Sequence, residues 1–169
     1  MRTALVIRLA LFLLLCAFIV APERFASIFA PLASNGAPAI YTQTSLLSLT
    51  LSHLALVATG TIAATIISVG LAILVTRQAG AEFLPLSRSI ANIGQTFPPV
   101  AVLALAVPVF GFGPVPTLIA LFLYGLLPIF ENALTGLSNI APSVTEAARG
   151  VGMTPLQRLV SVELPLALP

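Results

Sequence analysis

The chain has 169 residues, of which 59% are hydrophobic and 7% are charged, and its mean hydropathy is +1.12. A soluble domain carries about a quarter charged residues, so this composition excludes an ordinary soluble domain and indicates a membrane protein. The charges come from seven arginines and five glutamates, and the formal net charge of +2 is too small to build a nucleic-acid-binding surface.

The single cysteine and the single histidine exclude two more kinds of site. Cys16 has no partner for an intramolecular disulfide, and His53 cannot form a two-histidine metal site. An apolar role for Cys16 and an interfacial position for His53 at the outer end of a membrane span fit the pattern better. We expect no metal, no cofactor and no catalytic residue, and look for function in the membrane architecture.

Four apolar stretches are long enough to cross a bilayer, for which a helix needs about 20 apolar residues. In the first, Arg8 lies where its head can extend to the lipid headgroups. A cleaved signal peptide is the alternative, although no small-x-small cleavage site follows. We expect a retained transmembrane helix at 1–22, further spans at about 51–76, 90–110 and 115–138, and an irregular extracytoplasmic loop at 23–50, inferred from Pro31, Ser34, Asn35, Gly36 and Pro38.

The positions of the arginines predict the orientation, because short positively charged loops stay in the cytoplasm. With a cytoplasmic N-terminus, only Arg24 falls on the outer side. All the others then lie inside: Arg2, Arg8, Arg77, Arg88, Arg149 and Arg158.

The second span carries small residues at every fourth position, which places them on one helix face. Such a face lets another backbone approach closely and predicts a helix packed inside a bundle. Chance spacing in an alanine-rich segment is the alternative. The four residues are Gly60, Ala64, Ser68 and Ala72.

The third span is interrupted by polar residues and then by two consecutive prolines. Each proline removes a backbone donor and clashes with the preceding turn, so the helix must kink or break there. In the fourth span a proline deprives the carbonyl of Tyr124 of its partner in the same way. Two interpretations stay open: a translocation path, because freed carbonyls in a membrane face protein or a wet cavity, or a static kink whose side chains bond to neighbouring helices. The candidate path residues are Asn92, Gln95, Pro98, Pro99, Tyr124 and Pro128.

Glu131 lies one turn after Pro128, about 10 Å from the cytoplasmic end of the fourth span by helical rise. A carboxylate inside a membrane is a functional hypothesis by default. Its position near the inner face also fits a side chain that extends to the surface or pairs with a basic partner.

Two short cytoplasmic helices are expected after the last span. Ser143 and Glu146 have the spacing of a capping box, and Gly150 and Gly152 provide a C-terminal stop. A second start follows at Thr154, with Pro155 in the first turn and Gln157 completing another capping box, and this helix should run toward Val162. Because the pair carries only two arginines, a protein partner fits it better than DNA.

The stretch 146–165 resembles the EAA loop of ABC importer permeases. That pattern is Glu-Ala-Ala, three residues, Gly, nine residues, Ile, one residue and Leu-Pro. Segments 95–101, 123–128 and 162–167 also resemble the subfamily that serves glycine betaine, choline and related osmoprotectants. The residues that match the loop are Glu146, Ala147, Ala148, Gly152, Leu164 and Pro165, with Val162 in place of Ile.

The resemblance implies an all-α polytopic membrane bundle with a type I, MetI-like importer permease core at 51–169. This core is incomplete, because the family continues beyond Pro169 into further spans. It also implies a bacterial inner-membrane subunit whose EAA residues dock on a cytoplasmic ATPase, together with a second permease subunit and an extracytoplasmic solute-binding protein. Since the chain has no lysine, it cannot contain a Gly-x-x-x-x-Gly-Lys phosphate loop, and the ATPase must be another chain.

Other classes of function are also considered. A proton-coupled secondary transporter would use Glu131 and His53 as a relay, and a non-catalytic structural membrane subunit would need neither. An intramembrane enzyme is disfavoured, because the chain has no Gly-x-Ser-x-Gly and no His-Glu-x-x-His motif.

Overall fold

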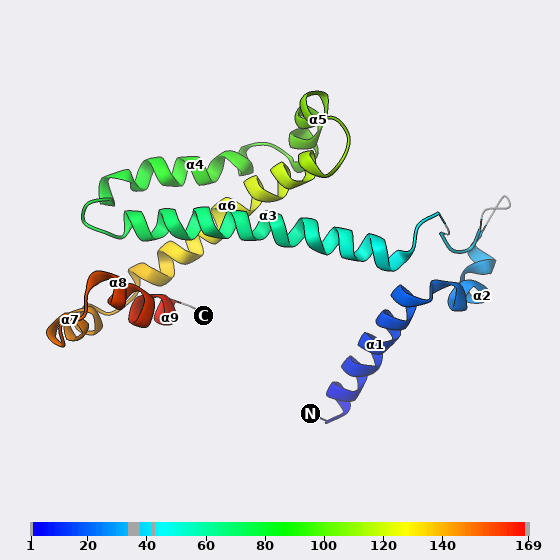
Figure 1. The fold of residues 1–169 in the computed structure, drawn as a ribbon, viewed down its shortest axis with the longest axis horizontal. Coiled ribbons are helices and arrows are strands. Elements are labelled where there is room, and N and C mark those ends of the chain that lie inside the picture. The colour runs from blue at the N-terminus through cyan, green and yellow to red at the C-terminus, as the bar shows by residue number, and fades with distance from the viewer. Residues whose placement is uncertain (1, 34–37, 42, 168–169) are drawn as a thin grey trace. The chain divides into compact units, whose positions relative to one another are not determined.

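The computed structural model describes residues 2–33, 38–41 and 43–167, and within these ranges every regular element is helical. This architecture confirms the predicted all-α class (Figure 1). The chain divides into two compact units, 1–55 and 56–169, which are described separately. The elements are α1 (Arg2–Val20), α2 (Ala26–Phe29), α3 (Leu46–Val75), α4 (Leu84–Thr96), α5 (Pro99–Phe110), α6 (Pro114–Ser138), α7 (Pro142–Gly150), α8 (Pro155–Arg158) and α9 (Leu164–Ala167).

The first unit contains α1, α2 and the start of α3. The ring of Phe18 on α1 lies 5.3 Å from that of Phe25 and 5.8 Å from that of Phe29, centroid to centroid, so the chain after α1 folds back on its end. The segment expected to be an irregular loop therefore contains α2 and two 3-10 turns, Pro22–Phe25 and Ala30–Leu32. Its turn residues Ser34, Asn35 and Gly36 lie outside the described residues.

Helix α3 is 30 residues long, about 45 Å by helical rise, and begins five residues before the predicted start of the second span. The hydroxyl of Ser45 accepts a hydrogen bond from the Ser48 N–H at 3.2 Å, which satisfies a donor in the first turn and explains the earlier start.

The small-residue face of α3 packs against α6, as predicted. The residues of α3 that are buried are Gly60, Ala64, Ser68, Ala72 and Val75. A methyl group placed on Gly125 of α6 would lie 3.0 Å from the Ala64 Cβ, so the two backbones are in close contact. The hydroxyl of Ser68 donates a buried hydrogen bond of 2.9 Å to the Leu126 carbonyl.

The predicted break in the third span is present between α4 and α5, which meet at 87°. Phe97 is extended, with ψ of 145°, as expected for a residue before proline. The helical segment begins earlier than the predicted residue 90, because a 3-10 turn at Ala81–Phe83 leads directly into α4. Among the residues that the structure describes, three helices are long and apolar enough to cross a membrane, namely α1, α3 and α6, and the bent pair α4–α5 makes a fourth if it counts as one span.

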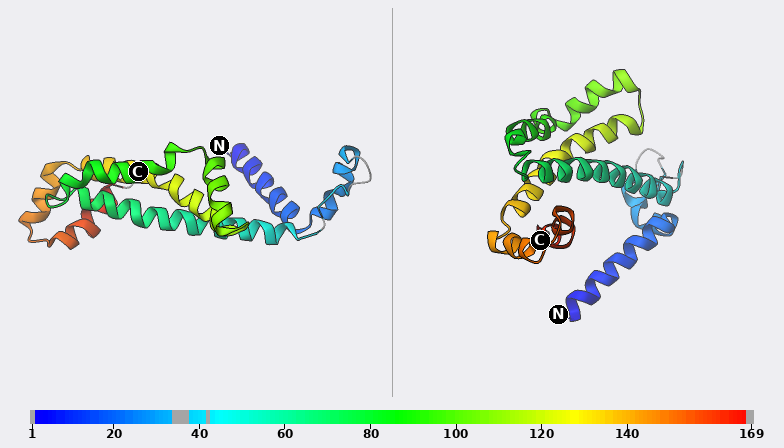
Figure 2. Two further views of the ribbon diagram at one scale, coloured as in Figure 1. Left: turned by 90° about the horizontal axis from the view of Figure 1, so that it is seen from above. Right: turned by 60° about the vertical axis from the view of Figure 1, so that its left-hand side comes forward.

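Within the second unit, α4 and the later part of α3 lie on α6, and the chain after α6 continues into α7, α8 and α9 (Figures 1 and 2). Gly94 lets α4 approach α6 closely, since a Cβ there would lie 2.1 Å from the Leu123 carbonyl oxygen. Ala167 of α9 meets Gly136 of α6 in a similar way, with 2.5 Å between an added Cβ and the Ala167 carbonyl oxygen. Close approach at small residues thus occurs where α3, α4 and α9 contact α6.

We predict that Gly94→Ala lowers the thermal unfolding temperature of the detergent-solubilised protein. The new methyl group overlaps backbone that cannot rotate away, and such overpacking destabilises by about 1–3 kcal/mol. The matched control is Gly70→Ala in α3, where no heavy atom lies within 4 Å of the added Cβ. Alanine at position 70 should leave the unfolding temperature unchanged or raise it. Equal unfolding temperatures of Gly94→Ala and Gly70→Ala would contradict the close contact between α4 and α6.

Candidate functional site

Helix α7 begins two residues earlier than the predicted capping box requires. Its N-cap is Ala141, Pro142 takes the first helical position, and no side chain caps the helix. The predicted box of Ser143 with Glu146 is therefore wrong, because a proline whose φ already suits a helix starts the first turn ahead of the serine. The carboxylate of Glu146 is left exposed to solvent rather than bound to its own helix end.

Gly152 closes α7 with the hydrogen bonds of a Schellman turn. The Met153 N–H donates to the Ala148 carbonyl at 3.1 Å, and the Gly152 N–H donates to the Arg149 carbonyl at 2.9 Å. Gly152 has φ of +81°, the left-handed region that favours glycine. The predicted stop at this glycine is confirmed, while Gly150 is the last residue of the helix.

Helix α8 begins with the predicted capping box. The Thr154 hydroxyl accepts from the Gln157 N–H at 3.3 Å, and the Gln157 side-chain oxygen accepts from the Thr154 N–H at 2.9 Å. The continuation differs from the single helix expected up to Val162. The chain passes through a π turn at Leu159–Glu163 and then into α9, which ends at Ala167.

Exposed apolar side chains lie in and after the turn between α7 and α8. Val151 in the turn, Leu156 in α8 and Val160 in the π turn are 75%, 69% and 56% exposed, and Glu146 and Ala147 on α7 are also exposed. Ala148, which the resemblance also assigns to the docking surface, is 5% exposed and packs inward instead. We call the exposed residues Glu146, Ala147, Val151, Leu156 and Val160 together the tip surface. The remaining residues of the motif lie at its base: Val162 and Leu164 are half-buried and Pro165 is exposed.

A buried ion cluster lies at the base of the helix pair and was not predicted. Oε2 of Glu163 lies 2.5 Å from Nη2 of Arg77, and Oε1 lies 2.7 Å from Nε of Arg158. The hydrogen bond from Arg77 is the main cause that holds the pKa of Glu163 below its usual range; Arg158 acts in the same direction, and burial opposes both. The only sign of the cluster in the sequence was a glutamate inside the apolar run 159–167, which requires a cationic partner.

A small polar cavity of about 160 Å³ adjoins this cluster. Residues from the end of α3, from α7 and from α8 line this cavity, and three of them are arginines. Its polar lining consists of Thr76, Arg77, Thr145, Arg149, Arg158 and Glu163.

Two hydrogen bonds between α4 and α6 satisfy backbone carbonyls next to the prolines. Pro128 has no N–H for the Tyr124 carbonyl, and the side-chain amide of Gln95 donates to that carbonyl at 3.1 Å. The Tyr124 hydroxyl in turn donates to the carbonyl of Phe97, which ends α4 beside Pro98. The hydrogen bonds expected of a static kink are therefore present, and a translocation path at this place stays a prediction.

The other candidate path residues lie on either side of this pair of bonds. Pro99 opens α5, directly after the break. Asn92 is exposed on α4, and its carbonyl accepts from the Thr96 hydroxyl at 3.2 Å.

Glu131 is paired rather than free. The Arg88 guanidinium of α4 donates to both of its oxygens, at 2.5 Å from Nε and 3.0 Å from Nη2. A bidentate arginine pair of this kind holds a carboxylate charged and fixed. This geometry favours the pairing interpretation of Glu131 over a titrating relay group.

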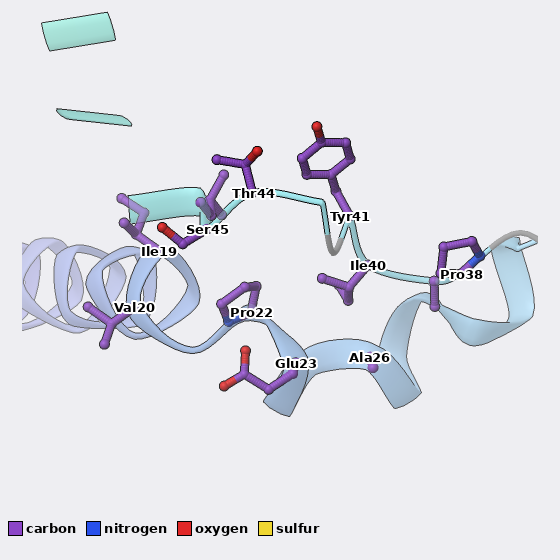
Figure 3. Close-up of a pocket in the computed structure, with 12 residues that line it drawn as sticks. Ile19, Val20, Pro22, Glu23, Ala26, Pro38, Ile40, Tyr41, Thr44 and Ser45 are labelled. Carbon is purple, nitrogen blue, oxygen red and sulfur yellow. The ribbon is translucent and has the colours of Figure 1, made fainter. Parts of the chain in front are cut away.

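A cavity of about 510 Å³ in the first unit lies between the end of α1 and the segment that leads into α3. Figure 3 shows that the ring of Tyr41 points away from the carboxylate of Glu23. A ring and a carboxylate that point apart do not form a cage for an organic cation. None of the predicted site residues lines this cavity.

Comparison with known proteins places the C-terminal part of the chain in one family. Residues 68–169 match the model of the family described as "Binding-protein-dependent transport system inner membrane component". This matched region contains the ion cluster, the broken helix pair and both short helices.

Three similar proteins come from bacteria. The osmoprotectant import permease protein OsmY of Salmonella typhimurium is 46% identical over 127 residues, which cover 75% of this chain and 54% of that protein. The choline transport system permease protein OpuBB of Bacillus subtilis is 38% identical over 125 residues, covering 73% and 56%. The glycine betaine/carnitine/choline transport system permease protein OpuCB of the same species is 44% identical over 78 residues, covering 46% and 36%. The chain spans about half the length of the first two of these relatives.

We predict that Gly152→Ala destabilises the turn between α7 and α8. A residue with a Cβ costs about 1–2 kcal/mol in the left-handed conformation, so amide hydrogen exchange at Met153 should become faster. The control is Gly150→Ala, which lies in the helix with no heavy atom within 4 Å of the added Cβ. If both variants exchange like the parent, the Schellman turn is not the stop of α7.

We also predict that stability falls in acid through Glu163. Its pKa is lower in the folded protein than in the unfolded chain, so its contribution is complete above the unfolded value of about 4.3 and disappears as the pH falls from there through the folded pKa. Unfolding temperatures measured between neutral and acidic pH should show this loss.

Glu163→Gln should be less stable than the parent at neutral pH and should have a flatter pH profile. Glu82→Gln, in the 3-10 turn before α4, serves as the control because its side chain is exposed. If the unfolding temperatures of the parent and of Glu163→Gln change with pH in parallel, the loss of stability in acid does not come from Glu163.

Proposed function

This chain belongs to the family of binding-protein-dependent transport system inner membrane components, and we propose that it acts within the permease subunit of an ATP-driven importer. The solutes we propose are osmoprotectants such as glycine betaine and choline. Relatives named for osmoprotectant and choline transport support this class. The observation that carries the proposal is the tip surface, which exposes Glu146 and apolar side chains after the last membrane helix.

The partners that we propose are cytoplasmic ABC ATPase subunits, a second permease subunit and an extracytoplasmic solute-binding protein. The chain has no lysine, so ATP hydrolysis belongs to another protein. Val151, Leu156 and Val160 on the tip surface offer the apolar area that a protein partner can bury. Membrane lipid surrounds the apolar helices, and nucleic acid has no role.

We propose that the tip surface lies in the cytoplasm of a bacterial cell, with the N-terminus on the same side of the inner membrane. Arg77, Arg149 and Arg158 line one small cavity at the end of α3, and positively charged ends of membrane helices stay inside. Helix α3 then crosses from the outer to the inner side, and α1 crosses in the opposite direction before it. Arg88, near the start of α4, agrees with this orientation.

The mechanism proposed is alternating access driven by the ATPases. Glu146 and Ala147 contact the ATPase, Gly152 gives the turn its shape, and Val162, Leu164 and Pro165 connect the helix pair to the membrane segment. Ala148 contributes by packing within the pair. Movement of the pair shifts the break between α4 and α5 together with the Pro128 region of α6, where the translocation path would run past Asn92, Gln95, Pro98, Pro99 and Tyr124.

No observation favours the proton-coupled alternative. It needs a carboxylate that gains and loses a proton during transport, and Glu131 is held by two hydrogen bonds from Arg88. An arginine partner stabilises the charged form of a carboxylate and opposes that exchange.

We predict that Glu146→Ala in the complete permease weakens ATPase binding by about 1–2 kcal/mol, a factor of roughly 5–30. Uptake should fall in parallel while membrane insertion persists, because Glu146 is exposed and supports no contact within the fold. Co-purification of the ATPase and solute uptake into vesicles measure the two effects.

Glu82→Ala is the matched control, since it removes an exposed glutamate from the turn between α3 and α4. The proposal is contradicted if ATPase binding is the same in the parent and in Glu146→Ala, or if uptake continues after ATP is depleted.

A further inference from the structure

We propose that the Arg77–Glu163–Arg158 cluster is the joint that transmits movement of the α7–α8 pair to the cytoplasmic end of α3. The inference rests on the proposed function and assigns positioning roles to three residues outside the tip surface. Arg158 and Glu163 lie within the stretch 146–165, but none of the three is among the residues that match the loop motif.

The two oxygens of Glu163 are bound by arginines from different parts of the chain. Arg158 is the last residue of α8 and lies only five positions away, so its contact of 2.7 Å is local. Arg77 lies two residues after the end of α3 and 86 positions from Glu163, and its contact of 2.5 Å joins two distant segments. One carboxylate therefore connects the end of a membrane helix to the base of the helix pair.

The carboxylate end of this connection is buried. Glu163 is 4% exposed and Arg158 is 9% exposed, while the side chain of Arg77 is 32% exposed, so water has little access to the Glu163 carboxylate. An ion pair shielded from solvent interacts more strongly than a surface pair. A displacement of α8 must then either move Arg77 with it or leave a buried carboxylate with one partner fewer.

The other membrane helix that meets the pair is connected differently. Helix α6 leads to α7 through three residues of chain, and Ala167 of α9 packs on its Gly136. Helix α3 is remote in sequence and reaches the pair through Arg77. Because α3 also packs along α6 through its small-residue face, α3, α6 and the pair form a closed ring of contacts.

Arg77→Gln removes the contact between the end of α3 and Glu163 and leaves the other contacts of the ring in place. Arg158 still neutralises Glu163, so no buried charge is left without a partner, and such an uncompensated charge is the usual cause of severe destabilisation. The tip surface itself is unchanged, because Arg77 lies outside it. In this variant, ATPase binding can therefore be measured separately from the transmission of movement to α3.

The experiment uses the complete permease assembled with its ATPase and solute-binding protein in liposomes. ATP hydrolysis and solute uptake are measured on the same preparation, and co-purification reports ATPase binding. We expect Arg77→Gln to bind ATPase and hydrolyse ATP like the parent, while solute moved per ATP falls by about fivefold or more, the lower end of typical coupling between sites. Arg77→Lys, which keeps the charge, should restore most of this ratio, and Arg24→Gln in the first unit should leave it unchanged.

Three outcomes overturn the inference. If Arg77→Gln moves as much solute per ATP as the parent, the ion cluster does not transmit movement of the helix pair to α3. Loss of ATPase binding in proportion to uptake means that Arg77 only maintains the fold of the docking site. A parent complex without ATP-dependent uptake refutes the proposed function itself, and this result is distinguishable because it does not depend on the variant.

Discussion

Helices in a lipid environment gain little from hydrophobic burial, so they associate through close packing of their backbones. In this chain three helices pack on α6 where a side chain is small. Gly125 meets Ala64 of α3, Gly136 meets Ala167 of α9, and Gly94 of α4 meets the backbone of α6. The positions of α3, α4 and α9 on α6 thus depend on the absence of a bulky Cβ. Since α7 follows α6 after three residues, the location of the tip surface depends on the same contacts.

The second constraint is that backbone carbonyls freed by proline need donors where water is scarce. Pro128 and the prolines after Phe97 disturb two helices that lie side by side. Gln95 donates to the Tyr124 carbonyl that Pro128 leaves open, and the Tyr124 hydroxyl donates to the Phe97 carbonyl at the end of α4. Two hydrogen bonds therefore join α4 to α6 next to the bend of 87°. These bonds allow α4 and α6 to move together at this place.

Features fixed by local chemistry were predictable from the sequence, and those fixed by distant contacts were not. The small-residue face of α3, the break before Pro98, the Thr154 capping box and the turn at Gly152 each depend on neighbouring residues. The Ser143 box was wrong because Pro142 offered a competing helix start two residues earlier. Glu163 gave a weak signal, a charge in an apolar run, but its partner Arg77 lies 86 positions away, and no local pattern identifies a pair at that separation.

The π turn at Leu159–Glu163 explains how Arg158 and Glu163 come to face each other. Residues five positions apart in an α-helix point about 140° away from one another, whereas a π turn, which bonds each residue to the fifth one along, stacks them on one side. The Leu164 N–H closes such a bond with the Leu159 carbonyl. The winding of this segment is thus part of its chemistry: if the same residues wound as an ordinary α-helix, with no residue removed, the carboxylate would rotate away from its arginine even with every charge retained.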